Sequence, residues 1–148
     1  MGTDPIIKTA QVPMTPDRAF DLFTTKMASW WPLQTHSVSA GMGAPSKDVL
    51  FHGGADGKIE EIAHDGSRHI WGRVTDWVPG VSLGFTWHPG KAEDRQTYVR
   101  VEFKASESGT LVTLTHEGWE NLSDEDRATH GSYQEGWNGV LALYQSAA

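Results

Sequence analysis

The sequence of 148 residues contains no cysteine, which excludes a disulfide framework, a thiolate nucleophile and a cysteine metal site. It also has no apolar run of the roughly 18 residues that a membrane-spanning helix needs. The N-terminus lacks the basic segment followed by an apolar one that marks a secretory signal. These absences predict a cytoplasmic protein without membrane insertion.

Positive charge and familiar catalytic motifs are scarce as well. Only 12 basic residues face 19 acidic ones, and they are scattered, so the formal charge of −7 disfavours binding to nucleic acid. The sequence has no Gly-x-Ser-x-Gly elbow, phosphate loop or dinucleotide fingerprint, and we expect no cofactor. The 7 histidines include no i, i+4 pair and no His-x-His, so no metal site is expected.

Tryptophan, in contrast, is abundant. The chain contains 7 tryptophans within an ordinary globular composition of 38% hydrophobic and 21% charged residues. Large aromatic side chains fill cores and also line ligand pockets. The length is that of one domain, and we expect residues 1–148 to form a single one.

The stretch from Ser123 to Tyr144 predicts a long C-terminal helix. Ser123 is a favourable N-cap, and the three residues after it place negative charge in the first turn. A stripe at steps of three and four follows, made of Tyr133, Trp137, Val140, Leu141 and Tyr144. We expect this stripe to be buried against a sheet, with a kink near Gly131.

The N-terminal third predicts a strand, short helices and a loop. Residues 5–12 have the pattern of a first strand, and Thr15 with Pro16 opens a helix whose buried face continues to Met27. Trp30, Trp31 and Pro32 end it. Residues 33–47 have no periodicity, which predicts a mobile surface loop suited to act as a lid.

Six further segments alternate like β-strands, and turn signals separate them. They are residues 49–52, 58–63, 69–77, 81–88, 97–103 and 110–117. The layout is α+β, an antiparallel meander with the terminal helix across one face. In the strand 81–88, Val81, Leu83, Phe85 and Trp87 share the apolar face.

Strand parity also predicts where polar and aromatic side chains point. Glu61 shares a face with Ile59, and His116 continues an inward row, so we expect both to meet at one polar spot of the interior. Trp71 has the opposite parity to Gly72, which predicts an exposed or edge position. Trp77 shares that parity unless a bulge re-aims it.

Motifs spread over nearly the whole chain resemble those of a known family. They are Phe20-Asp21-Leu22-Phe23-Thr24 with Trp30-Trp31-Pro32, Gly57-Lys58-Ile59-Glu60-Glu61, Trp71-Gly72-Arg73-Val74, Phe85-Thr86-Trp87, Val99-Arg100-Val101-Glu102-Phe103, Leu114-Thr115-His116-Glu117-Gly118 and Gly136-Trp137. This pattern resembles the SRPBCC or START-like superfamily, in its branch of homologues of the activator of heat-shock-protein-90 ATPase. The resemblance implies a helix-grip fold, a curved antiparallel sheet around the C-terminal helix with a cavity between them.

The resemblance implies binding of a small apolar or amphipathic ligand. The residues expected to contact it are Trp30, Trp31, Glu61, Trp87, Val99, Val101, His116, Tyr133 and Trp137. A polyketide cyclase or hydrolase that uses Glu61 and His116 for proton transfer is an alternative. A regulatory domain that binds a chaperone is weaker, because the co-chaperones carry a further N-terminal domain. A homodimer is compatible with the sequence.

Overall fold

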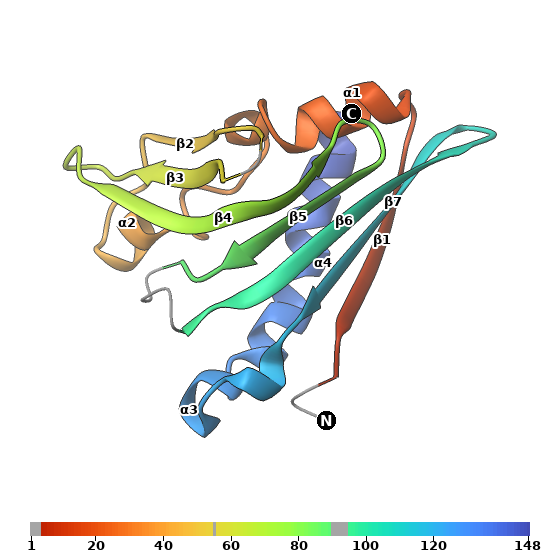
Figure 1. Cartoon of the computed structure of the whole chain (residues 1–148). Helices are drawn as coiled ribbons and strands as arrows, with labels where there is room; N and C mark the ends of the chain where they lie inside the picture. The colour runs from red at the N-terminus through yellow and green to blue at the C-terminus, as the bar shows by residue number, and fades with distance from the viewer. Residues whose placement is uncertain (1–3, 55, 90–94) are drawn as a thin grey trace.

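The computed structural model describes residues 4–54, 56–89 and 95–148, and in them a seven-stranded antiparallel sheet packs against a long helix (Figure 1). The strands are β1 (Ile6–Val12), β2 (Asp48–Phe51), β3 (Lys58–Ile62), β4 (Arg68–Val78), β5 (Ser82–Trp87), β6 (Thr97–Ser106) and β7 (Gly109–Glu117). Their order across the sheet is β1-β7-β6-β5-β4-β3-β2, so β2 to β7 form a meander and β1 pairs with β7.

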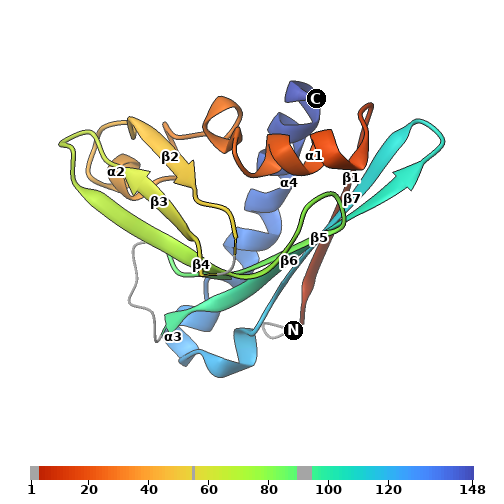
Figure 2. The same ribbon diagram turned by 45° about the horizontal axis from the view of Figure 1, so that its top comes forward.

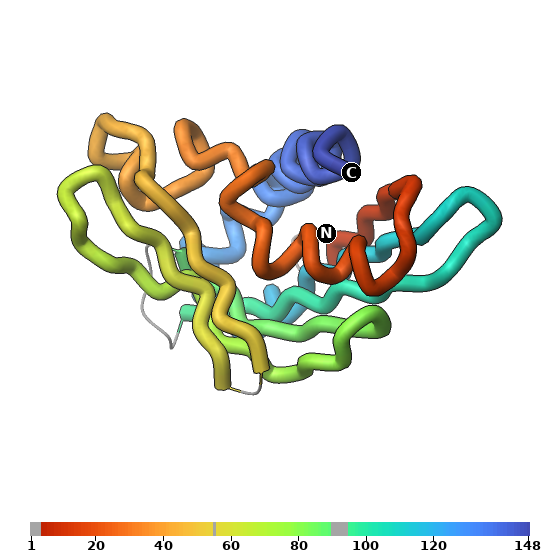
Figure 3. Tube along the Cα trace, turned by 90° about the horizontal axis from the view of Figure 1, so that it is seen from above, coloured from red at the N-terminus to blue at the C-terminus, as the bar shows by residue number. Residues whose placement is uncertain are grey.

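The helical elements lie between β1 and β2 and at the C-terminal end of the chain. They are α1 (Pro16–Phe23), the 3-10 turn η1 (Met27–Ser29), α2 (Val38–Gly41), the 3-10 turn η3 (Trp119–Asn121), α3 (Asp124–Arg127) and α4 (His130–Ala147). Seen from above, the sheet curls into an open half-barrel, and α1 and α4 lie on its concave side (Figure 3). This α+β helix-grip arrangement confirms the predicted fold class.

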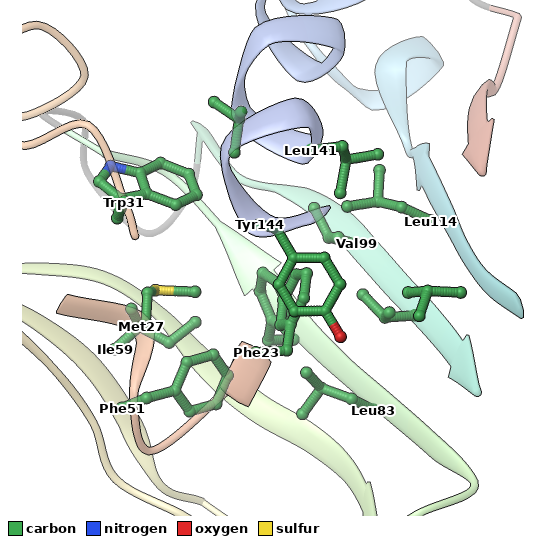
Figure 4. Close-up of a cluster of buried hydrophobic side chains, with 14 of the residues drawn as sticks. Phe23, Met27, Trp31, Phe51, Ile59, Leu83, Val99, Leu114, Leu141 and Tyr144 are labelled. Atoms are coloured by element: carbon green, nitrogen blue, oxygen red, sulfur yellow. The ribbon is translucent and has the colours of Figure 1, made fainter. Parts of the chain in front are cut away.

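An apolar core fills the space between the concave face and the helices. Along β6 and β7 the inward residues are buried and alternate with more exposed ones, as the sequence pattern predicts. Figure 4 shows Phe23 and Tyr144 at the centre of this core, and their ring centroids are 5.3 Å apart. The Tyr144 hydroxyl donates to the Ala19 carbonyl oxygen at 2.7 Å, and burial raises the pKa of Tyr144. This bond fixes the C-terminal end of α4 to α1, which crosses it (Figure 2).

The predicted C-terminal helix is interrupted between α3 and α4. Ser123 caps α3, where its hydroxyl accepts from the Asp126 backbone N–H at 3.3 Å. The Asp126 carbonyl oxygen then accepts from both the N–H and the hydroxyl of Thr129, at 3.1 and 2.6 Å. Because that carbonyl is already bonded within a tight turn, the helix does not continue, and α4 begins anew at His130. The expected irregularity near Gly131 therefore lies just before it.

Two other predicted boundaries are wrong. The helix from Pro16 ends at Phe23, where Thr24 leaves the helical conformation as the C-cap; its N–H and hydroxyl both donate to the Phe20 carbonyl oxygen, at 3.1 and 2.8 Å. Met27 is nevertheless buried, since η1 turns it back to the core. Val81 lies before β5 in a turn and is 57% exposed, although alternation placed it inward.

A β-bulge corrects the prediction for Trp71. Ile59 pairs with Gly72 and Glu60 pairs with Ile70, so Trp71 is an extra residue in β4. The extra residue turns its side chain to the inner face, and Trp71 is fully buried. Alternation alone cannot reveal this, since a bulge shifts the parity of the strand by one residue.

A second bulge re-aims Trp77, as the sequence analysis had allowed. Val74 pairs with Phe85 and Asp76 pairs with Gly84, which leaves Thr75 between them without a partner in β5. Trp77 consequently pairs with the inward Leu83 and packs edge-on against Phe20, with ring centroids 4.9 Å apart. The indole closes the end of the core below α1.

Candidate functional site

A cavity of about 600 Å³ lies between α4 and the segment that carries α2. The segment contributes residues between Thr35 and Met42, and α4 contributes Ser132, Tyr133, Gly136 and Val140. Figure 3 shows this segment between the β2–β4 side of the sheet and α4. We call this cavity the pocket.

Indole rings form the inner wall of the pocket. Trp31 comes from the turn after η1, Trp87 from the end of β5 and Trp137 from α4. The ring centroid of Trp31 lies 5.8 Å from that of Trp87 and 6.0 Å from that of Trp137, and Trp87 and Trp137 are 5.8 Å apart. Such a wall offers flat apolar surfaces to a ligand.

The structure brings only part of the predicted site set together. Trp31, Trp87, Tyr133 and Trp137 line the pocket, whereas the other predicted residues do not: Trp30, Glu61, Val99, Val101 and His116. Trp30 packs in the core, where its indole N–H donates to the Leu22 carbonyl oxygen at 2.7 Å. Val99 and Val101 are buried under the helix.

Glu61 faces the interior, as its parity with Ile59 predicts, and is fully buried. One carboxylate oxygen accepts from the Val38 backbone N–H at 2.8 Å and from the Trp71 indole N–H at 2.9 Å. The other oxygen accepts from the Ser39 backbone N–H at 2.8 Å. The buried charge is thereby satisfied by three donors and holds the first turn of α2.

The segment 33–47 is therefore an anchored wall, and the expectation of a mobile loop is not supported by its contacts. Ser37 caps α2 by accepting from the Ala40 N–H at 3.0 Å. The Ser39 hydroxyl is buried and donates to the Ala44 carbonyl oxygen at 2.9 Å, while it accepts from the His64 N–H, also at 2.9 Å. The segment is thus tied to β3 and to His64, two residues beyond it.

His116 is also fully buried and belongs to a separate chain of hydrogen bonds. Its Nδ1 accepts from the Trp137 indole N–H at 3.0 Å, and because an indole can only donate, the imidazole proton resides on Nε2. Nε2 then donates to the Thr97 hydroxyl at 2.6 Å, and that hydroxyl donates to the Trp87 carbonyl oxygen at 3.3 Å. This series of hydrogen bonds connects α4 to β7, β6 and β5.

Glu61 and His116 do not share a polar spot. Their strands, β3 and β7, are separated in the sheet by β4, β5 and β6. Strand parity predicts correctly that both side chains point inward, but it carries no information on the lateral distance between strands. Each group instead has its own indole donor, Trp71 for Glu61 and Trp137 for His116.

Burial lowers the pKa of His116 to about 3, with a smaller contribution from the charge of His130. The imidazole is therefore neutral at pH 7, and both ring nitrogens are engaged. A general acid or base needs a pKa near the working pH. The neutral imidazole, bonded at both nitrogens, ties α4 to the sheet.

This pKa predicts a loss of stability in mild acid. Between pH 6.5 and about 3 the unfolded chain takes up a proton on His116 that the folded chain refuses, so the contribution present above pH 6.5 is lost as the pH falls. Lowering the pH from 7.5 to 5.5 should reduce the free energy of unfolding by about 1.3 kcal/mol through His116 alone.

The control is His116→Gln, whose amide can accept from Trp137 and donate to Thr97 without titrating. Urea unfolding at both pH values should show the stability gap between the parent and this variant narrowing by about 1 kcal/mol at pH 5.5. NMR should find no titration of the His116 ring above pH 5. A constant gap, or a ring pKa near 6.5, would contradict the prediction.

The sequence analysis missed the polar pocket residues of the segment 35–42. His36 is exposed at the surface and also lines the pocket, and its Nε2 lies 3.9 Å from where a Cβ would stand on Gly136. Its Nδ1 contacts the Thr35 hydroxyl at 2.7 Å. No periodicity marks this segment, because its position depends on the bonds from Glu61 to the backbone.

Among the described residues, no cluster of three or more histidine, aspartate or glutamate side chains has the geometry of a metal site. No helix in the same part of the chain is long and apolar enough to cross a membrane.

The sequence profile of the family described as "Activator of Hsp90 ATPase homolog 1-like protein" matches residues 13–143. The chain belongs to this family. The match extends from the turn after β1 into α4 and so includes both walls of the pocket. A comparison with curated proteins gives no match.

Solved structures share the fold of this family member over almost their full length. Protein MLL2253 from Mesorhizobium loti superposes with a TM-score of 0.70 at 14% identity, over 97% of this chain and 95% of that one. The Aha1 dimer from Colwellia psychrerythraea gives 0.70 at 17% identity, over 98% and 96%. The anthrahydroquino-gamma-pyrone synthase Txn09, complexed with SUM, gives 0.68 at 24% identity, over 100% and 99%. Identities this low show a common fold and leave the activity open.

Proposed function

We propose that the protein binds a small, largely apolar molecule in the pocket between α4 and the segment 35–42. The observation that carries this proposal is a preformed cavity of about 600 Å³ whose inner wall consists of indole rings. Ligand sites are typically clefts of about 300–1,000 Å³ with apolar and aromatic walls and few polar groups. The bonds from Glu61 keep the outer wall in place without a ligand.

A cyclase-like enzyme is the second candidate, because the solved structure of an anthrahydroquino-gamma-pyrone synthase has the same fold. The residues first considered for catalysis do not support it, since His116 and Glu61 lie outside the pocket and are fully bonded. An enzyme on this fold would have to use pocket groups such as Tyr133 or His36. A reading as a chaperone-binding domain rests on the family description alone.

The assembly and location of the protein also belong to this proposal. The Aha1 protein of Colwellia psychrerythraea was solved as a dimer, which supports a homodimer here. A cytoplasmic location and a single domain remain predictions from the sequence.

Blocking the pocket from α4 should abolish ligand binding. Gly136 faces the pocket, and a leucine there would project its side chain toward His36 and the indoles, whereas Gly139 lies on the exposed face of the same helix with open space around it. N-phenyl-1-naphthylamine, a neutral fluorescent probe, should bind the parent and Gly139→Leu equally and bind Gly136→Leu at least tenfold more weakly. Both substitutions replace glycine in a helix, so neither should lower the melting temperature by its effect on the helix backbone.

Tryptophan emission gives a second readout of the same titration. Because Trp31 lies at the pocket wall, a bound probe should change its emission, and the segment 33–47 should gain protection from protease. Native mass spectrometry of freshly purified parent and Gly136→Leu would show whether a molecule copurifies with the parent only. Equal probe affinity in all three proteins would contradict the proposal.

A further inference from the structure

The inner wall of the pocket contains a buried donor without an acceptor. Trp87 is 4% exposed, and its indole N–H makes no hydrogen bond with any described residue. The neighbouring group is the Tyr133 hydroxyl, on whose pKa the Trp87 N–H acts in the lowering direction. The two groups are therefore neighbours in the pocket wall, and no hydrogen bond to a described residue satisfies the Trp87 N–H. A buried unpaired donor is costly and calls for a partner in the functional state.

Tyr133 presents a proton to the pocket. Burial outweighs the effect of Trp87 and raises the pKa of Tyr133, so the phenol stays protonated. Its ring is held by the side chains behind it, with centroids 5.0 Å from His116 and 5.5 Å from Trp119. When the Trp87 N–H occupies the acceptor side of the oxygen, the hydroxyl proton is left to donate.

Other pocket hydroxyls near this wall are already engaged. The Thr35 hydroxyl contacts His36 Nδ1 at 2.7 Å, and the Ser37 hydroxyl donates to the Leu33 carbonyl oxygen at 2.8 Å. Ser132 lies on α4 beside Tyr133 but is exposed to solvent. Tyr133 is thus the half-buried pocket hydroxyl whose proton no described residue accepts.

The described residues that line the pocket carry no fixed positive charge to receive an anion. None of the described residues that line the pocket is lysine or arginine, and His36 is the titratable group besides Tyr133. A carboxylate or sulfonate would lose its hydration without a counter-charge. A neutral acceptor oxygen matches the donors without that cost.

We propose, building on the proposed function, that the ligand is a flat ring system with a neutral carbonyl oxygen. The Tyr133 hydroxyl donates to this oxygen, the Trp87 N–H donates to the Tyr133 oxygen, and the rings lie against the indoles of Trp31 and Trp137.

The test compares 9-fluorenone with fluorene, two flat probes that differ by a carbonyl in place of a methylene group. The parent should bind fluorenone about tenfold more tightly, since one hydrogen bond gained at a buried donor corresponds to roughly that factor. Tyr133→Phe, which keeps the ring, should remove this preference by weakening fluorenone and leaving fluorene unchanged. Ser132→Ala should keep the preference. The bound fluorenone carbonyl stretch should move to lower wavenumber in the parent and return in Tyr133→Phe.

The outcomes separate the two proposals. Equal affinity of both probes for the parent, or a preference that survives in Tyr133→Phe, would overturn the carbonyl assignment while ligand binding stands. A preference lost in Ser132→Ala would move the contact to that residue and also overturn it. If neither probe nor N-phenyl-1-naphthylamine binds the folded parent, the ligand-binding function itself fails. Melting curves of each variant verify that it is folded.

Discussion

Replacing Glu61 by alanine is expected to lower the free energy of unfolding by at least about 3 kcal/mol. The substitution removes the acceptor of three buried donors, the backbone N–H groups of Val38 and Ser39 and the indole N–H of Trp71. Each donor left without an acceptor costs about 1–3 kcal/mol. The loss combines this desolvation cost with a small cavity at the carboxylate position.

The same substitution should release the outer wall of the pocket. Without the carboxylate, the first turn of α2 retains the Ser37 cap but loses its tie to β3. Hydrogen exchange should therefore accelerate in residues 33–47 more than in β6 or β7, and affinity for N-phenyl-1-naphthylamine should fall. Exchange measured by mass spectrometry, together with urea unfolding, gives both results.

Two variants serve as controls for Glu61→Ala. Glu60 is the neighbouring residue of the same type, but it points outward and pairs with Arg68 at the surface, so Glu60→Ala should cost less than about 1 kcal/mol. Glu61→Gln keeps one carbonyl acceptor but turns an amide N–H₂ toward the remaining donors. Its free energy of unfolding should therefore lie between those of the parent and Glu61→Ala. Similar losses for Glu60→Ala and Glu61→Ala would contradict the anchoring role.

Replacing Trp137 by alanine is expected to lower the free energy of unfolding by about 3–5 kcal/mol. The indole is 3% exposed, packs against Trp31 and Trp87, and donates to His116 Nδ1 at 3.0 Å. Trp137→Phe separates these contributions, since it keeps much of the ring but leaves His116 Nδ1 without a donor. That variant should lose about 1–3 kcal/mol through the unpaired nitrogen, besides the smaller ring.

The comparison residue for Trp137 is Leu143, which lies on the same helix and is 43% exposed. Leu143→Ala should change stability by no more than about 0.5 kcal/mol. Urea unfolding at pH 7.5 measures all three variants under one condition. A loss below about 1 kcal/mol for Trp137→Ala would mean that the indole does not belong to the core of the protein.

The periodicity of the sequence predicts the sheet and the buried face of α4, because both follow from local alternation of apolar and polar residues. Val112, Leu114 and His116 are buried in their predicted row. The bulge at Trp71 escapes such reasoning, since an inserted residue changes which face later side chains occupy. The interruption before α4 escapes it too, because it depends on hydrogen bonds of Thr129 that compete with the helix.

The candidate site is less predictable than the fold. Pocket-wall positions of Trp31, Trp87, Tyr133 and Trp137 agree with residues selected from the sequence, since these indoles and this phenol stand where helices and strand ends meet. The partners of Glu61 could not be predicted, because two of them are backbone N–H groups of a segment without periodicity. The order of apolar and polar side chains does not predict which backbone groups a carboxylate will bind.

The anchoring of α2 by Glu61 has a consequence for protein engineering. The carboxylate binds the N–H groups of Val38 and Ser39, which any residue except proline supplies, so the anchor does not depend on which side chains the segment carries. Positions such as Thr35, His36 and Met42 can therefore be randomised in a library while the wall keeps its place. The residues that hold the outer wall are thus separate from those whose side chains line the pocket.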